Sequence, residues 1–279
     1  MTADRPSRRV VALLAAVGVT LLSAVALGVW RPWAPVAPPQ AADGTQAAVV
    51  QPSPVVLPDE PTVLIFGDSW TYGSAATERD QGYAYVLGQS LGWNAIVDGV
   101  RASGYLKPGI DGPSYGDRIA ALDPDLDPDL VILQGSINDR RQDLSLYADA
   151  VNAAWDALAE LYPDAAVVVL GPAPQILPVE KTTAQIDEGL ASLAAARGWW
   201  YVSPIAEDWI TEADYDWIID TSERGKDHPS DAGHAYLAGR VADAIARATE
   251  PVLVEAADQA VPATPDTTTT HVDESTPSR

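Results

Sequence analysis

The sequence predicts an α/β domain in which a five-stranded parallel sheet lies between two layers of helices. Short apolar runs alternate along the chain with segments in which apolar residues recur every three or four positions. Such alternation is typical of strand–helix–strand units joined by right-handed crossovers. The first run, residues 63–66, is apolar at four consecutive positions, as expected of a strand covered on both faces. The hydrophobic content of 47% is sufficient for one globular core.

The predicted strands and helices follow one another in regular order. We expect strands at residues 63–66, 94–97, 129–133, 165–170 and 199–202, and helices at residues 82–91, 115–122, 143–161, 179–197 and from 231 to about 249. The helix at 143–161 is the clearest because its apolar residues recur at helical spacing, and Pro163 ends it. Gly198 closes the next helix, and Ser230 is a good N-cap for the last one.

The N-terminal segment predicts export. Arg5, Arg8 and Arg9 precede 21 uncharged residues, 10–30, which as a helix would span about 32 Å, enough to cross a hydrocarbon core of roughly 30 Å. The arginine flank favours a cytoplasmic N-terminus. We expect a membrane anchor at residues 1–30, because a cleaved signal peptide usually has a shorter apolar region. Cleavage before Val29 stays open, and both alternatives place the body outside the cytoplasm.

Composition divides the rest of the chain into three parts. Residues 31–59 are a Pro/Ala-rich linker, residues 60–250 a single domain, and residues 251–279 a disordered acidic tail rich in Thr and Pro. The formal net charge of −22 excludes nucleic acid as a partner, because the phosphate backbone would be repelled. The absence of cysteine excludes disulfides and thiolate metal sites.

Candidate catalytic residues follow predicted strands or precede the last helix, and the carboxyl ends of parallel strands meet at one edge of a sheet. Gly67-Asp68-Ser69 follows the first strand, Gly104 the second and Asn138 the third, while His228 precedes the last helix. A serine hydroxyl becomes a nucleophile when a base accepts its proton, and histidine can take and return that proton near neutral pH. Ser69 and His228 are therefore a candidate catalytic pair.

Ester cleavage also requires hydrogen-bond donors aimed at the oxygen that becomes negative. The backbone N–H groups of Ser69 and Gly104 and the side-chain amide of Asn138 are candidates, since glycine allows close backbone approach. The remaining histidines are not expected to take part. His234, one turn into the last helix, is expected at the surface or as a cap, and His271 lies in the acidic tail.

These blocks resemble the SGNH hydrolases, also called the GDSL esterase and lipase family, over nearly the whole domain. The family's four blocks match Ser69, Gly104, Asn138 and His228. The resemblance implies a flavodoxin-like three-layer α/β/α sandwich and a serine esterase that needs no metal or organic cofactor. Two departures stand out. Gly135 lies one place earlier than in the family's Gly-x-Asn-Asp block, and Gly225 stands where the family has an aspartate three residues before the histidine.

The missing aspartate leaves the third member of the catalytic triad open. In a triad this acid orients the imidazole and stabilises its charged form. Asp227 is our candidate because it is adjacent to His228 in sequence. Asp220 and a backbone carbonyl are the alternatives.

Other charged segments are expected to be structural. The acids of residues 123–129 alternate as in a calcium loop, but the sixth place lacks a glycine and the twelfth lacks a glutamate. A solvated turn is predicted there. Arg140 and Arg141, near Asn138, could face an anionic substrate, although local pairing is expected.

The sequence therefore predicts an exported serine esterase that acts through an acyl-enzyme on a carbohydrate or lipid ester. The membrane is a partner through the N-terminal helix, and the oligomeric state is not determined. Trp209, Tyr215 and Trp217 could stack on a sugar at the edge of the cleft, or simply pack. Two other functions stay open. The site could transfer an acyl group to a cell-envelope sugar, or the domain could be a catalytically impaired surface binding module, which the glycine at 225 favours.

Overall fold

The computed structural model describes residues 52–250. The predicted anchor at 1–30, most of the predicted linker and the predicted tail at 251–279 lie outside these residues. Within the described part, no helix is long and apolar enough to cross a membrane. The last residues of the predicted linker pack on the domain, because the Val55 N–H donates to the Ala248 carbonyl at 2.8 Å and Trp200 Nε1 donates to the Ser53 carbonyl at 2.8 Å. The folded body thus begins before residue 60.

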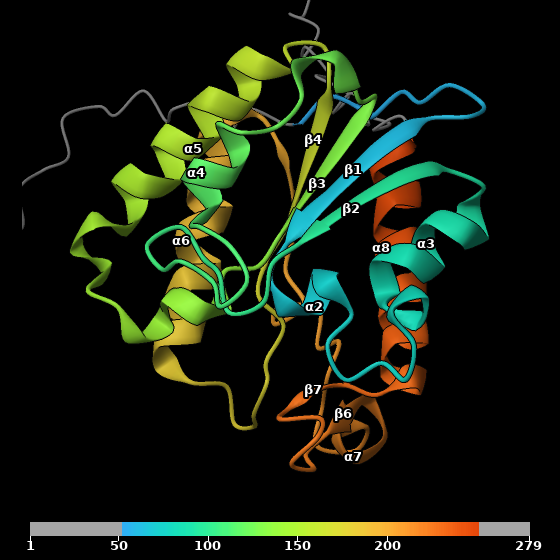
Figure 1. The fold of residues 1–279 in the computed structure, drawn as a ribbon, viewed down its shortest axis with the longest axis vertical. Helices are drawn as coiled ribbons and strands as arrows, with labels where there is room; N and C mark the ends of the chain where they lie inside the picture. The colour runs from blue at the N-terminus through green and yellow to red at the C-terminus, as the bar shows by residue number, and fades with distance from the viewer. Residues whose placement is uncertain (1–51, 251–279) are drawn as a thin grey trace, which may run out of the picture. The chain divides into compact units, whose positions relative to one another are not determined.

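The predicted parallel sheet is confirmed, and its five strands lie close to the predicted positions. The strands are β1 (Thr62–Gly67), β2 (Asn94–Gly99), β3 (Leu130–Gln134), β4 (Ala166–Leu170) and β5 (Trp200–Val202). They are ordered β2-β1-β3-β4-β5, and every neighbouring pair is parallel (Figure 1). The residues of β1 from Val63 onward are buried, which explains the uninterrupted apolar run.

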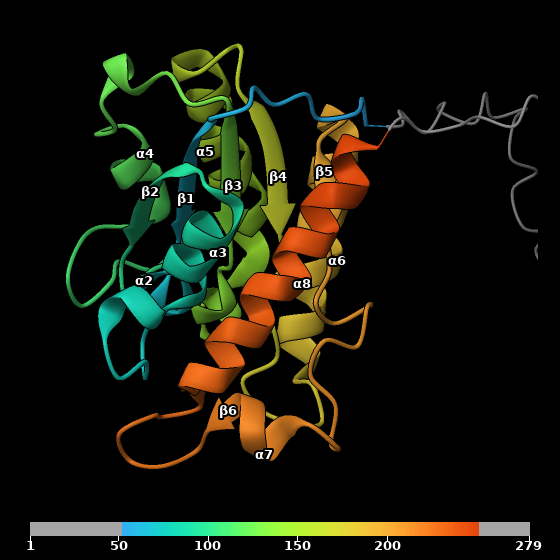
Figure 2. The ribbon, with the colours of Figure 1, turned by 90° about the vertical axis from the view of Figure 1, so that its right-hand side faces the viewer.

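Helices cover both faces of the sheet (Figures 1 and 2). One face carries α4 (Tyr115–Ile119), α5 (Tyr147–Leu161) and α6 (Lys181–Arg197), and the other carries α3 (Tyr83–Leu91) and α8 (Asp231–Thr249). Successive side chains of β1 enter opposite cores. Leu64 and Phe66 pack with the α4–α5–α6 layer, whereas Val63 and Ile65 pack with the α3–α8 layer.

Side-chain hydrogen bonds shape two short segments, one that differs from its predicted form and one that agrees with it. The predicted helix at 143–161 begins only at Tyr147, because the Asp143 side chain accepts the Ser145 N–H at 3.0 Å and caps a separate 3₁₀ turn, η4 (Leu144–Leu146). The acidic run at 123–129 forms the 3₁₀ turn η2 (Pro124–Leu126). Its last carboxylate, Asp129, accepts the Thr62 N–H at 2.8 Å and so ties the turn to the start of β1.

The strand order fixes where loops can meet. Because β1 lies between β2 and β3, the chain crosses to opposite sides as it leaves β1 and β3, and ligand sites in such sheets form at this switch point, beyond the carboxyl strand ends. Directly after β1 comes the one-turn helix α2 (Ser69–Tyr72), and shortly after β3 the 3₁₀ segment η3 (Ile137–Arg141). Ser69 and Asn138 therefore lie on adjacent loops at this point.

Candidate active site

Ser69 is held in a tight strand-to-helix turn. A Cβ on Gly67 would lie 2.2 Å from Thr71 Oγ1, so glycine is required for α2 to fold back against the end of β1. The Asp68 carboxylate caps α2 by accepting the Trp70 N–H at 2.9 Å. Ser69 is 5% exposed and its hydroxyl lies at the cleft. Within the described residues its own N–H has no hydrogen-bond partner.

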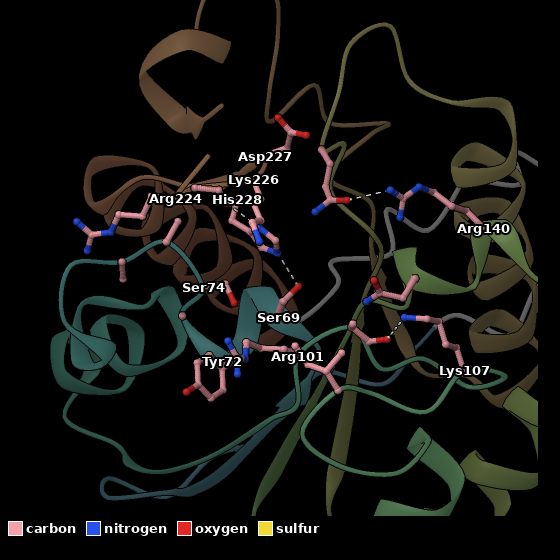
Figure 3. Close-up of a pocket in the computed structure, with 18 of the residues that line it drawn as sticks. Ser69, Tyr72, Ser74, Arg101, Lys107, Arg140, Arg224, Lys226, Asp227 and His228 are labelled. Atoms are coloured by element: carbon pink, nitrogen blue, oxygen red, sulfur yellow. Dashed lines mark hydrogen bonds between the residues drawn. The ribbon is translucent and has the colours of Figure 1, made fainter. Parts of the chain in front are cut away.

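His228 is 159 residues from Ser69 in sequence but contacts it in the folded domain. It lies in β7 (His228–Pro229), which pairs antiparallel with β6 (Ile219–Asp220). Nε2 of the imidazole is 2.9 Å from Ser69 Oγ, and Nδ1 is 2.9 Å from the Gly225 carbonyl oxygen (Figure 3). Because a carbonyl can only accept, Nδ1 carries the proton, and Nε2 is left free to accept the Ser69 hydroxyl proton.

The imidazole is poised in its neutral form. Burial is the largest influence and lowers the pKa of His228 below its usual value, whereas the Gly225 carbonyl and the nearby Asp227 charge act in the opposite direction. At neutral pH His228 is therefore mostly unprotonated, the state that a general base requires.

The predicted role of Asp227 needs correction. Asp227 sits in a left-handed turn with φ of 60°, its carboxylate points away from the imidazole (Figure 3), and no hydrogen bond joins the two described side chains. The Asp220 carboxylate is engaged elsewhere, accepting the Ser222 N–H at 2.9 Å. Neither acid holds His228. The residue at the family's aspartate position, Gly225, instead contacts Nδ1 through its backbone carbonyl.

Asn138 lies at the cleft as predicted, and its amide is anchored. Nδ2 donates to the Ser103 carbonyl at 3.0 Å and more weakly to the Asp68 carboxylate at 3.4 Å. Asp68 is fully buried, and this desolvation raises its pKa to about 7 despite the Trp70 N–H bond and the charge of Arg118. The segment after β3 therefore contacts the segment after β1 at the switch point, through the side chains of Asn138 and Asp68.

The expectation for Gly104 also needs correction. Its N–H donates to the Lys107 carbonyl at 2.8 Å, and it does not line the cleft. A Cβ at this position would lie 2.4 Å from the Asp139 carboxylate, so glycine is needed for packing. Ala102 lies at the cleft instead, with φ of 60° and an N–H that has no partner among the described residues. No sequence signal marked it, because alanine seldom adopts this conformation.

His234 is buried, contrary to the surface or capping position expected for it. Its Nδ1 accepts the Tyr83 N–H at 3.1 Å and its Nε2 donates to the Ser74 carbonyl at 3.0 Å. Burial lowers its pKa to about 4, so the ring is neutral at pH 7. His234 thus links the start of α8 to α3 and to the loop that follows α2.

The three aromatic residues proposed to stack on a sugar do not line the cleft. Trp209 is buried, and the Tyr215 hydroxyl donates to the Gln175 carbonyl. Trp217 is 48% exposed and packs edge-on against Tyr236. Their arrangement supports the packing alternative.

The cleft itself has a volume of about 660 Å³ and contains both Ser69 and His228 (Figure 3). Arg140 and Arg141 both lie on its wall. Arg140 pairs with Glu180 at 2.7 Å, which confirms the expected local pairing for this residue. Arg141 has no ion pair among residues 52–250. The cleft is therefore large enough for a small ester and is lined largely by polar groups.

Comparison with known proteins agrees with the resemblance. The model of the GDSL-like lipase/acylhydrolase family matches residues 65–236, more than half of the chain. GDSL lipase Rv0518 of Mycobacterium tuberculosis is 30% identical over 198 residues, covering 66% of this chain and 80% of the lipase.

Solved structures share the fold. Est24, a carbohydrate acetylesterase from Sinorhizobium meliloti, gives a TM-score of 0.53 at 19% identity, over 67% of this chain and 99% of its own. The aryl esterase of M. smegmatis gives 0.52 at 20% identity, over 67% and 99%. From its matched sequence and its fold, the chain belongs to the GDSL-like lipase/acylhydrolase family of ester hydrolases.

Proposed function

We propose that this protein is a serine esterase in which Ser69 is the nucleophile and His228 the general base. The observation that carries the proposal is the 2.9 Å approach of His228 Nε2 to Ser69 Oγ, with Nδ1 tied to the Gly225 carbonyl. This geometry presents an unprotonated nitrogen to a hydroxyl at a cleft, which is the arrangement that activates a serine.

The proposed reaction has two stages. Ser69 Oγ attacks the ester carbonyl carbon while its proton passes to Nε2 of His228. As the tetrahedral intermediate collapses, the bond to the alcohol breaks, the imidazolium gives its proton to the departing alcohol, and an acyl-enzyme remains. Water then loses a proton to Nε2 and attacks the acyl-enzyme, which releases the carboxylic acid and returns the proton to Ser69.

Three donors are proposed for the oxyanion of the intermediate. The N–H groups of Ser69 and Ala102 have no partner among the described residues, and the Asn138 amide is only weakly engaged on its Asp68 side. Ala102 replaces Gly104, whose N–H is occupied. Loss of one such donor typically costs about 3 kcal/mol of transition-state stabilisation.

In this proposal a backbone carbonyl takes the orienting role that an aspartate has in the family. The Gly225 carbonyl fixes the tautomer and orientation of His228, as an acid would. It carries only a partial charge, so it stabilises the imidazolium less than a carboxylate does. The site is a dyad supported by a dipole, and no carboxylate is required for the proton transfers.

The proposed substrate is an ester of a carbohydrate or lipid outside the cytoplasm. The location rests on the sequence of residues 1–30 alone, with its arginine-flanked apolar run. Fractionation of cells that produce the full chain tests it, because a fully cytoplasmic protein would contradict export.

The catalytic proposal is tested with a chromogenic acetate and a serine-directed phosphonate. Wild-type protein should turn over the acetate and be labelled at Ser69, and Ser69→Ala should lose both, with turnover falling at least about 10³-fold. Ser74→Ala is the matched control, because it removes another hydroxyl at the same cleft and should leave labelling intact. Absence of both turnover and labelling in the wild type would overturn the proposal.

A further inference from the structure

The cleft around Ser69 carries charge opposite in sign to the rest of the domain. Between residues 52 and 250 the chain has 12 Lys or Arg and 32 Asp or Glu. Seven of those basic side chains line the cleft, but only one acidic residue, Asp227, does. More than half of the basic charge of a strongly acidic domain is thus gathered at its candidate active site.

Three of the seven are committed to structural contacts. Arg101 pairs with Asp111 at 2.6 Å, and Arg140 pairs with Glu180 at 2.7 Å. Lys107 Nζ donates to the Ala102 carbonyl at 2.8 Å. These contacts stabilise the cleft wall. The other four basic side chains supply the remaining positive charge of the cleft.

The other four are exposed and have no ion pair among the described residues: Arg79, Arg141, Arg224 and Lys226. They come from three segments that surround the catalytic pair. Arg79 begins η1 (Arg79–Gln81) after the Ser69 turn, Arg141 ends η3, and Arg224 and Lys226 flank Gly225 beside His228 (Figure 3).

We infer that the substrate is a short-acyl ester of a sugar that carries a carboxylate or phosphate, which Arg79, Arg141, Arg224 and Lys226 bind. The inference rests on the proposed function and names its substrate class. The net negative charge of the domain repels anions at long range. Within the cleft, where screening leaves only short-range interactions, the cations attract an anionic group. Arginine forks also match the oxygens of carboxylates and phosphates.

The lining favours a sugar over a lipid. Ile110, 69% exposed, is the large aliphatic side chain among the described lining residues, and the other apolar ones there include Ala75, Ala76 and Ala102. A long acyl chain needs an apolar strip that these residues do not provide. The Gln142 amide and the NH₂ group of Gln175, whose Oε1 accepts from Arg140 at 3.1 Å, are instead available for hydroxyl groups.

Binding to the full-length Ser69→Ala protein tests the inference without requiring turnover. The probes are an acetylated methyl glucuronoside and its uncharged methyl ester, titrated calorimetrically at low and high salt. The charged ligand should bind about tenfold more tightly, since an exposed ion pair contributes roughly 1.4- to 5-fold and about 1.8-fold from each of the four cations multiplies to that factor. Salt should reduce this preference. Adding Arg141→Gln and Arg224→Gln should lower the preference for the charged ligand from about tenfold to about threefold, because two of the four cations remain.

Lys181→Gln is the matched control, because Lys181 is an exposed cation without an ion pair among residues 52–250 and lies off the cleft. This substitution should leave the preference unchanged. Equal binding of both ligands would overturn the inference while leaving Ser69-dependent acetate turnover, and so the proposed function, intact. Selective binding without Ser69-dependent turnover in the wild type would instead overturn the function and support the anion site. Preferential hydrolysis of an anionic phospholipid in vesicles would overturn the sugar assignment.

Discussion

Replacing Gly225 with aspartate would restore the residue that the family carries at this position, yet the structure predicts a loss of activity. A Cβ at residue 225 would lie 2.2 Å from the Asp220 carbonyl oxygen and 2.2 Å from its Cγ. Backbone must therefore move. Because Asp220 is paired with His228 in the β6–β7 register, the same movement carries the Gly225 carbonyl away from Nδ1.

The magnitude follows from two terms. Overpacking of this kind typically costs about 1–3 kcal/mol, which for a domain of this size lowers the melting temperature by roughly 2–12 °C. Loss of the hydrogen bond that orients the imidazole through Nδ1 costs about 1 kcal/mol. We expect kcat/KM to fall at least about fivefold, since 1 kcal/mol is close to that factor.

The assay is kcat/KM on a chromogenic acetate together with thermal unfolding of the same samples. Gly239→Asp is the control, because a Cβ at that helical glycine meets nothing within 4 Å. It should leave both quantities nearly unchanged. A higher kcat/KM in Gly225→Asp than in the wild type would refute the reasoning, since the new carboxylate would then have replaced the carbonyl without displacing the turn.

Three further predictions concern the acids and the histidines. Asp227→Asn and Asp220→Asn should each keep kcat/KM within about threefold of wild type, because neither carboxylate bonds the imidazole; a tenfold loss in either would restore that acid to the triad. The pH profile of kcat/KM should rise with deprotonation of His228 and reach its midpoint below the usual histidine value, because burial lowers this pKa; a midpoint above 6.5 would contradict it. His234→Ala should lower the free energy of unfolding by about 2–4 kcal/mol through a cavity and lost hydrogen bonds; urea unfolding measures this, and an unchanged midpoint would count against it.

The sheet could be predicted from local pattern because burial on both faces forces consecutive apolar side chains. The run at 63–66 became β1 with one residue added at each end. The start of α5 could not be predicted in this way. The Asp143 side chain accepts the Ser145 N–H and the helix begins four residues later than expected, and apolar spacing does not report such a local hydrogen bond.

Ser69 and His228 could be proposed as a catalytic pair from chain order because the reactivity of a serine and a histidine belongs to their side chains. What Gly225 contributes is a carbonyl, which every residue has, and the turn that joins β6 to β7 brings this one to Nδ1. Similarly, both Gly104 and Ala102 offer an N–H, and the fold decides which of the two is occupied.

The sequence by itself therefore determined the layer architecture and the proposed nucleophile–base pair, since each depends on side-chain type and order. The tertiary structure decided which groups surround that pair. It buried His234 between α8 and α3, turned Asp227 away from the imidazole, and gathered cations from three distant segments around Ser69. Those outcomes depend on which backbones meet across the domain, and residue type at a single position carries no record of its neighbours in space.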